Sequence, residues 1–486
     1  MPSKHNFSAP QDSLISALKE GKMAYNFQKT YTLIAQTPMI HFQHDQAGAT
    51  LRATEVKPKL DKYLLQCAQK SNINQELLNS WCTPPSDKKA TSYAPFRYKM
   101  QIKRMGRPTD SKITIEDCKF YFGNRGSALK KDLVFSNCEL EIICFIPALM
   151  EFIQKHIASF FVLHNFGTRQ TKGFGGFRIM DQADKRMQSD EEIEKAIKDS
   201  HTLYFYADIP PADQSSISKR FNHALTIYSV MKNGLNLTGY NEKRERYWHP
   251  NRYIKGFAMR SYLDEASKTL KIGSDKAFIK SKIHAPAQVD DQEKEKSDRD
   301  YPEYTFIRAL LGLAERYEFR DRYRNNGTSE NPNTHKISYN PVGVDVINCP
   351  ANADGSPKID AGKSISDLKK NSEIQRFASP VTIKIYQNRI YFLFNDSYKQ
   401  MLGRTFLFLS FRKRGANVTY ELDSRCIEQK HYLSTPKEFD MKMFIERFVS
   451  YYNTTVKGKL KFFVEDRADF ENPYANSGNL TLQKGW

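Results

Sequence analysis

The order of hydrophobic patterns over roughly the first 180 residues constrains the fold of this chain more than any other feature. One helical stripe would carry Val56, Leu60, Leu64 and Cys67. A second helix would open with Pro147 and stop at Gly167, the usual punctuation of a helix. The expected elements are a strand at 29–42, a helix at 55–70, strands at 96–104 and 133–146, a helix at 147–166, and a strand entered from the glycine run at 173–180. The order β-α-β-β-α-β predicts an α+β domain of the ferredoxin-like type.

The second half of the chain is less regular but repeats the same kinds of pattern. Its expected elements are a strand at 201–209, helices at 215–233 and 304–319, a hairpin at 381–395, a strand at 404–412, a helix at 437–452 and a strand at 458–464. Two segments have the composition of insertions: 285–303 is densely charged, and 324–372 is rich in Asn, Gly, Pro and Ser. The sequence therefore predicts two ferredoxin-like domains with insertions, at 1–195 and 196–486.

Charge points to the class of partner. Lysine and arginine total 74 against 55 acidic residues, a formal net charge of +19. An excess of this size favours a polyanion, because each neutralised phosphate releases counterions. The alternative is a basic scaffold protein without an RNA role. No apolar run is long enough for a membrane span, and no lipidation signal is present, so we expect no membrane partner.

Motifs for cofactors, metals and small-molecule substrates are missing. The sequence has no phosphate-binding P-loop, no GxSxG elbow and no HExxH pair, and its seven cysteines are scattered without a CxxC. Dispersed cysteines in odd number are typical of reduced thiols, which favours a cytoplasmic protein. We therefore expect no cofactor, no metal and no small-molecule substrate.

A glycine-rich segment at 167–178 is the strongest local signal. Glycines allow positive φ and close approach of a ligand to the backbone, cations bind phosphate, and aromatic rings stack on bases. The candidate residues are Arg169, Lys172, Gly173, Phe174, Gly175, Gly176, Phe177 and Arg178. The alternative is a tight turn alone. The segment follows a helix and enters a strand, the reverse of the order in a dinucleotide-binding fold.

A glycine-rich loop in this position resembles the mark of the RAMP superfamily of CRISPR proteins. Three further stretches are similar to one branch of it: Thr37-Pro38-Met39 with the run LRATEVKPKL at 51–60, the run RALLGL at 308–313, and the run RFASP at 376–380. Together they resemble the first-numbered RAMP subunit of the type III-B (Cmr) effector complex. The resemblance implies a non-catalytic subunit that holds the crRNA 3′ region and target RNA beside other RAMP subunits.

The resembling stretches add candidate RNA-binding residues. Arg52, Lys57 and Lys59 would lie at the start of the first helix, where the helix N-terminus also attracts phosphate. Their alternative is a solvated helix face. Arg376 and Ser379 would position RNA or merely cap a strand.

Evidence for an active site is thin. His41, His44 and Asp45 form the best polar cluster, but nothing marks a catalytic partner, and a polar loop is the favoured interpretation. The run Tyr247-Trp248-His249 stacks on RNA or closes a domain interface, whereas His156 and His164 are expected to be structural. The alternative function is a crRNA-processing RAMP endoribonuclease. In such enzymes the glycine-rich loop lies near the C-terminus, so the position of this one argues against processing.

Overall fold

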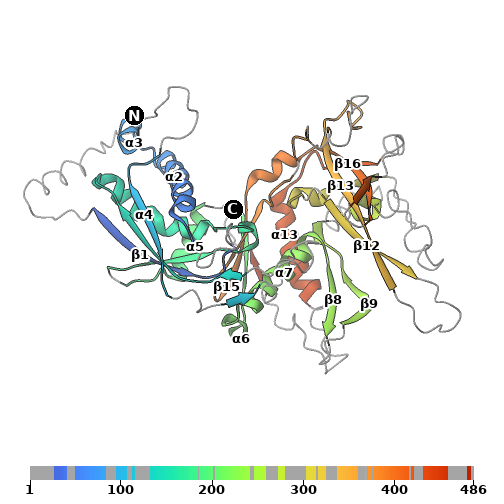
Figure 1. The fold of residues 1–486 in the computed structure, drawn as a ribbon, viewed down its shortest axis with the longest axis horizontal. Coiled ribbons are helices and arrows are strands. Elements are labelled where there is room, and N and C mark those ends of the chain that lie inside the picture. The colour runs from blue at the N-terminus through green and yellow to red at the C-terminus, as the bar shows by residue number, and fades with distance from the viewer. Residues whose placement is uncertain are drawn as a thin grey trace, which may run out of the picture. The chain divides into compact units, whose positions relative to one another are not determined.

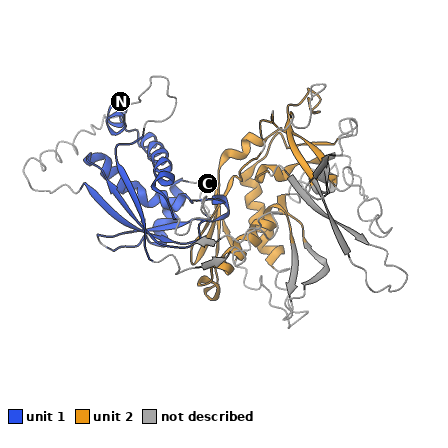
Figure 2. Ribbon diagram, viewed as in Figure 1, with its two compact units in different colours: residues 1–117, 130–200 blue, residues 118–129, 201–486 orange. Residues whose placement is uncertain are grey.

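The computed structural model separates the chain into two compact units (Figure 2), one of residues 1–117 and 130–200 and one of residues 118–129 and 201–486. The structure describes residues 27–40, 50–83, 95–106, 112–114, 132–183, 185–200, 203–240, 246–258, 272–279, 303–313, 316–324, 337–358, 367, 370, 372–374, 376–414, 417–420, 431–457 and 479–482. No helix within these ranges combines the length and the hydrophobicity of a membrane span.

The first unit contains an antiparallel sheet with the order β2-β5-β1-β6. Its strands are β1 (Gln28–Ala35), β2 (Lys99–Arg104), β5 (Cys138–Ile143) and β6 (Phe177–Asp181), and its two long helices are α2 (Ala53–Lys70) and α4 (Pro147–Leu163). Figure 1 shows strand β1 together with the helices α2 and α4. Smaller elements are α3 (Gln75–Trp81), β3 (Lys112–Thr114), β4 (Asp132–Val134), η1 (Gln170–Lys172) and α5 (Asp190–Ser200). The order of the sheet strands and long helices is the predicted ferredoxin-like plan, which is thereby confirmed.

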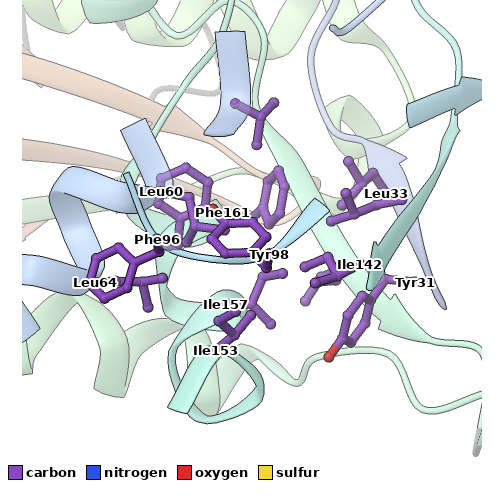
Figure 3. Packing of buried hydrophobic residues seen from close by; sticks show 14 of the residues in the cluster. Tyr31, Leu33, Leu60, Leu64, Phe96, Tyr98, Ile142, Ile153, Ile157 and Phe161 are labelled. Atoms are coloured by element: carbon purple, nitrogen blue, oxygen red, sulfur yellow. The ribbon is translucent and has the colours of Figure 1, made fainter. Parts of the chain in front are cut away.

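Alternation along the strands explains how this sheet buries one face. Tyr31 and Leu33 of β1 and Leu140 and Ile142 of β5 point into a core that both long helices cover. The contributions of α2 recur every four residues, at Val56, Leu60, Leu64 and Ala68. Figure 3 shows Leu60 and Leu64 of α2 and Ile153, Ile157 and Phe161 of α4 in one cluster with Tyr31, Leu33 and Ile142 of the sheet.

Local boundaries in the first unit differ from the expected ones. The first strand ends at Ala35, and the expected strand 133–146 is two strands, β4 and β5. Helix α4 ends at Leu163 instead of 166, and its last turn is followed by extended backbone at His164. The fourth buried position of α2 is Ala68, while Cys67 is half-buried. Taking Gly167 as the signal for the helix end therefore overestimated the length of α4 by about one turn.

The second unit contains a sheet of the same design, with the order β14-β15-β7-β19, all antiparallel. Its strands are β7 (Tyr204–Asp208), β14 (Val381–Ile385), β15 (Arg389–Phe394) and β19 (Leu480–Leu482), and its long helices are α7 (Ile217–Lys232) and α13 (Met441–Tyr451). Phe205 of β7 stacks on Phe392 of β15 and contacts Phe448 of α13, with centroid distances of 4.7 and 5.6 Å. The chain order β7-α7-β14-β15-α13-β19 repeats the ferredoxin-like plan.

A five-stranded antiparallel sheet lies between these elements in the sequence. It consists of β12 (Arg316–Arg324), β13 (Ile337–Cys349), β16 (Thr405–Arg414), β17 (Asn417–Tyr420) and β18 (Tyr432–Ser434). The remaining elements are α6 (Pro211–Gln214), β8 (Leu235–Tyr240), β9 (Arg246–Ile254), β10 (Ile272–Ser274), α9 (Asp275–Phe278), β11 (Glu303–Thr305), η3 (Ile307–Leu311), η4 (Asp396–Met401) and η5 (Tyr452–Val456).

Several expectations for the second half need correction. The prediction of a helix at 304–319 is wrong, because this segment forms β11, the 3-10 turn η3 and the start of β12. The insertion 324–372 contains the long strand β13. The strand expected at 404–412 exists as β16, but it pairs in the inserted sheet. The strand expected at 458–464 lies outside the described residues, as does the charged insertion 285–303 up to residue 302.

Candidate nucleic-acid interface

The glycine-rich loop folds back onto the segment that precedes it. Phe166 donates its backbone N–H to Gly175 O at 3.0 Å, and Gly175 donates to Pro38 O at 3.0 Å. Gly176 donates to Thr37 Oγ1 at 2.8 Å. The Thr-Pro stretch and the glycine-rich loop, which are far apart in the sequence, therefore form one structural unit.

Glycine is needed here because the backbone approaches itself. Gly173 and Gly175 have φ of 86° and 72°, the left-handed region that glycine adopts without strain. A Cβ on Gly175 would lie 1.9 Å from Phe166 O. Gly176 keeps an ordinary φ, and a Cβ there would lie 3.1 Å from Thr37 Oγ1. The close approach expected toward a ligand is thus made, at Gly175, toward the chain's own backbone.

Helix α2 and the glycine-rich loop meet through one carboxylate and one amine. Glu55 Oε1 accepts the N–H of Gly167 at 2.7 Å. Lys59 Nζ donates to Asn165 O at 3.2 Å and to Gln170 Oε1 at 3.0 Å. Burial lowers the pKa of Lys59, and the neighbouring Glu55 opposes that shift. Lys59 therefore ties the helix to the loop.

Two other predicted cations also have intrachain partners. Lys57 Nζ lies 2.8 Å from Asp61 Oδ2, donates to Phe96 O at 3.1 Å and sits 4.1 Å from the centre of the Tyr98 ring. Arg178 donates to Gln188 O and to Asp190 Oδ1, at 2.8 and 2.7 Å. These contacts give Lys57 and Arg178 a structural role.

The aromatic residues of the loop are core residues. Phe174 is completely buried, and Phe177 is only 3% exposed. A base stacks on an exposed ring face, so the prediction that these two rings stack on RNA is wrong for this structure. The sequence pattern could not separate the two roles, because an aromatic ring beside glycines suits both a binding loop and a packed one.

Three further predicted cations are exposed or partly exposed near the start of α2. Arg52, the N-cap residue of α2, is exposed. Arg169, the N-cap residue of η1, and Lys172, its last residue, are partly exposed. Glu55, one turn after Arg52, contacts Gly167, so the helix start and the loop lie together. Arg169 holds a left-handed φ of 58°, which is unusual for a residue with a side chain. We call Arg52, Arg169 and Lys172 the basic rim.

The two resembling stretches of the second unit also meet. Leu313 and Phe377 form an isolated antiparallel bridge, with Leu313 N–H donating to Phe377 O at 3.0 Å. Ser379 Oγ accepts from the backbone N–H of Val381 at 3.2 Å and from the hydroxyl of Tyr228 at 3.3 Å. Arg376 is exposed beside this bridge. Ser379 thus supports the entry into β14.

The structure shows a buried charged cluster beside this bridge that was not predicted from the sequence. Lys232 Nζ donates to Leu311 O at 3.0 Å and to Gly312 O at 2.6 Å. Arg308 pairs with the fully buried Asp275. Burial, together with the positive charge of Arg308, lowers the pKa of Lys232 to about 7 against the attraction of Asp275. No local signal could find this cluster, because its members lie far apart in the sequence and all belong to different elements.

The weakly predicted catalytic residues receive no support. His41, His44 and Asp45 lie outside the described residues, and the side chains of Tyr247, Trp248 and His249 are likewise not described. His164 Nδ1 is 3.0 Å from Phe160 O, and the ring of His156 packs against Phe152, so both histidines have structural contacts. In the described ranges, no three side chains gather as ligands for a metal ion.

Two ferredoxin-like sheets, with a glycine-rich loop between the second helix and last strand of the first, define a RAMP-type protein. Models of the Cmr1 N-terminal domain and the Cmr1 C-terminal domain match residues 26–235 and 258–469. The chain belongs to the Cmr1 family, a RAMP subunit of the type III-B CRISPR effector complex. No curated protein matches the chain.

Proposed function

We propose that this chain binds the crRNA 3′ region and target RNA through the basic rim, without cleaving either strand. The observation that carries the proposal is the assembly of Arg52, Arg169 and Lys172 where the start of α2 meets the glycine-rich loop. Cationic side chains next to a helix N-terminus suit a phosphate backbone and read no sequence. The net charge of +19 supports the same class of partner.

The proposal divides the predicted residues by role. The basic rim contacts phosphate, while Lys57, Lys59 and Arg178 hold the elements that carry it. Gly173, Gly175 and Gly176 set the path of the loop. In the second unit, Arg376 is the exposed candidate for RNA, and Ser379 positions the strand that follows it.

Charge reversal tests the rim. The double variant Arg169→Glu with Lys172→Glu should weaken binding of single-stranded RNA and make the salt dependence of log K shallower by about one unit per lost phosphate contact. The matched control is Lys70→Glu with Lys155→Glu, an equal change of charge at exposed positions of α2 and α4. Equal losses in the two double variants would show that the net charge alone matters and would refute the rim.

Absence of catalysis is tested separately in the assembled complex. The variants His41→Ala, His44→Ala and Asp45→Asn should leave every RNA cleavage activity of the complex unchanged, because the proposal gives this chain no acid–base role. Loss of guide maturation in any of them would support the crRNA-processing alternative. Unaltered RNA affinity in both charge-reversal variants would support a scaffold without an RNA role.

A further inference from the structure

An exposed pair of stacked aromatic rings lies at one end of the first sheet. Phe27 is 46% exposed and Phe145 is 72% exposed. Their ring centroids are 5.3 Å apart, with an angle of 26° between the planes. Among the residues whose side chains the structure describes, the other large hydrophobic side chains with comparable exposure are Met105 and Met187, and neither is aromatic.

The backbone under the pair is part of the sheet. Cys144 donates its N–H to Phe27 O at 2.8 Å, which extends the pairing of β1 with β5 by one residue. Phe145 follows directly in the chain and precedes α4. The two rings are therefore presented by paired strand ends, which fix their positions more firmly than a loop does.

Burial does not explain these two rings. A phenylalanine side chain gains free energy when it is removed from water, and Phe145, which is 72% exposed, forgoes most of that gain. Phe174 and Phe177 of the glycine-rich loop, in contrast, are packed in the core. The surface that the loop lacks for stacking on a base is thus present at Phe27 and Phe145.

The charges near the pair favour a polyanion over an apolar partner. Lys99 is exposed and pairs in register with Ile143, two residues before Phe145. Lys29 lies two residues after Phe27. The nearest acidic side chain along these strands, Glu141, is 3.8 Å from Lys103 Nζ, which offsets its charge. Aromatic faces next to lysines are what binding of single-stranded nucleic acid requires.

We propose that Phe27 and Phe145 form a stacking platform for an unpaired RNA base, with Lys99 attracting a flanking phosphate. The inference rests on the proposed RNA-binding function and adds to it a second contact area, separate from the basic rim. It predicts that the chain distinguishes RNA with bases from an abasic ribose-phosphate chain, because only a base can stack.

The test compares single-stranded oligouridine with an abasic oligomer of equal length on the full chain. Phe145→Ala should weaken binding of oligouridine about 5- to 150-fold and leave binding of the abasic oligomer unchanged. Phe145→Tyr should retain the affinity, because it keeps the ring. Met187→Ala, which removes an exposed apolar side chain elsewhere in the same unit, is the matched control.

The outcomes separate this inference from the function on which it rests. If Phe145→Ala binds oligouridine normally while Arg169→Glu with Lys172→Glu does not, the platform is refuted and the rim stands. If Phe145→Ala instead impairs assembly with neighbouring subunits at unchanged RNA affinity, the pair is a protein-docking surface and the inference is overturned. If none of the variants changes RNA binding, the proposed function fails with it.

Discussion

Replacement of Gly175 by alanine should destabilise the first unit more than any other single added methyl group in the loop. Two costs add. A left-handed backbone costs an alanine roughly 1–2 kcal/mol, and Gly175 has φ of 72°. The added Cβ would also lie 1.9 Å from Phe166 O, far closer than any non-bonded carbon and oxygen atoms approach in proteins. The loop must therefore move away from Phe166.

That movement breaks two hydrogen bonds, from Phe166 N–H to Gly175 O and from Gly175 N–H to Pro38 O, each 3.0 Å long. Because Gly175 is buried, each broken hydrogen bond leaves polar atoms without a partner, which costs about 1–3 kcal/mol. With the backbone penalty, the expected loss in the free energy of unfolding is about 3–8 kcal/mol. RNA binding should fall as well, because the basic rim is carried by the same loop.

Gly355 supplies a matched control for the collision with Phe166. It has φ of 84°, and nothing lies within 4 Å of a Cβ built there. Gly355→Ala should therefore cost only the backbone penalty of roughly 1–2 kcal/mol. Hydrogen exchange in increasing denaturant, followed in β1 and in β14, reports the stability of each unit in the full chain. A loss in Gly175→Ala no larger than in Gly355→Ala would refute the argument from close approach.

Three further predictions address the loop and the buried cluster. Thr37→Val should lower the free energy of unfolding by about 1–3 kcal/mol in denaturant unfolding, because it removes the hydroxyl that accepts the buried N–H of Gly176 at 2.8 Å. Thr37→Ser keeps that hydroxyl and should keep the stability. A Thr37→Val variant as stable as the parent would contradict the role of this hydrogen bond. Arg169→Gly should relieve the strain of the left-handed backbone at this position. The stability of the first unit should then stay equal or rise by up to about 1 kcal/mol, while RNA affinity falls. A parallel loss of stability and affinity would argue against a rim residue held under strain. Lys232 has a pKa of about 7 in the folded chain, below its unfolded value, so folding disfavours its proton and the second unit should gain stability as the pH rises from about 7 toward 10. The gain is about 2–3 kcal/mol over two pH units, and it should vanish in Lys232→Met; an identical pH slope in the variant would exclude Lys232 as its source.

Local patterns were sufficient to predict the first unit. The stripe on α2, Pro147 at the start of α4 and the alternation in β5 are short-range signals, and they gave the right elements in the right order. The Thr-Pro stretch and the glycine-rich loop were also expected to belong to one domain, and the structure joins them. Helix ends were predicted less well, because extended backbone at His164 leaves no mark in the sequence.

Long-range pairing explains what the sequence could not predict. β7 pairs with β15 across about 180 residues, and β19 completes the sheet from a segment with no strong pattern. The segment at 304–319 has the apolar content of a helix, but the chain forms the turn η3 there, with Ile307 through Leu311 buried. Tertiary packing overrides helix propensity in that segment. The same limit applies to Phe174, which is buried, and to Phe145, which is exposed, because tertiary packing decides whether a phenylalanine ring is covered.

RNA–protein photo-crosslinking in the assembled type III-B complex reports directly whether the basic rim contacts RNA. The complex is purified with its native guide, irradiated with and without target RNA, and the crosslinked peptides of this chain are sequenced. We predict crosslinks within 167–178 and at the start of α2, which disappear in Arg169→Glu with Lys172→Glu but persist in Lys70→Glu with Lys155→Glu. Crosslinks confined to other segments, or a complex in which this chain never contacts RNA, would contradict this prediction.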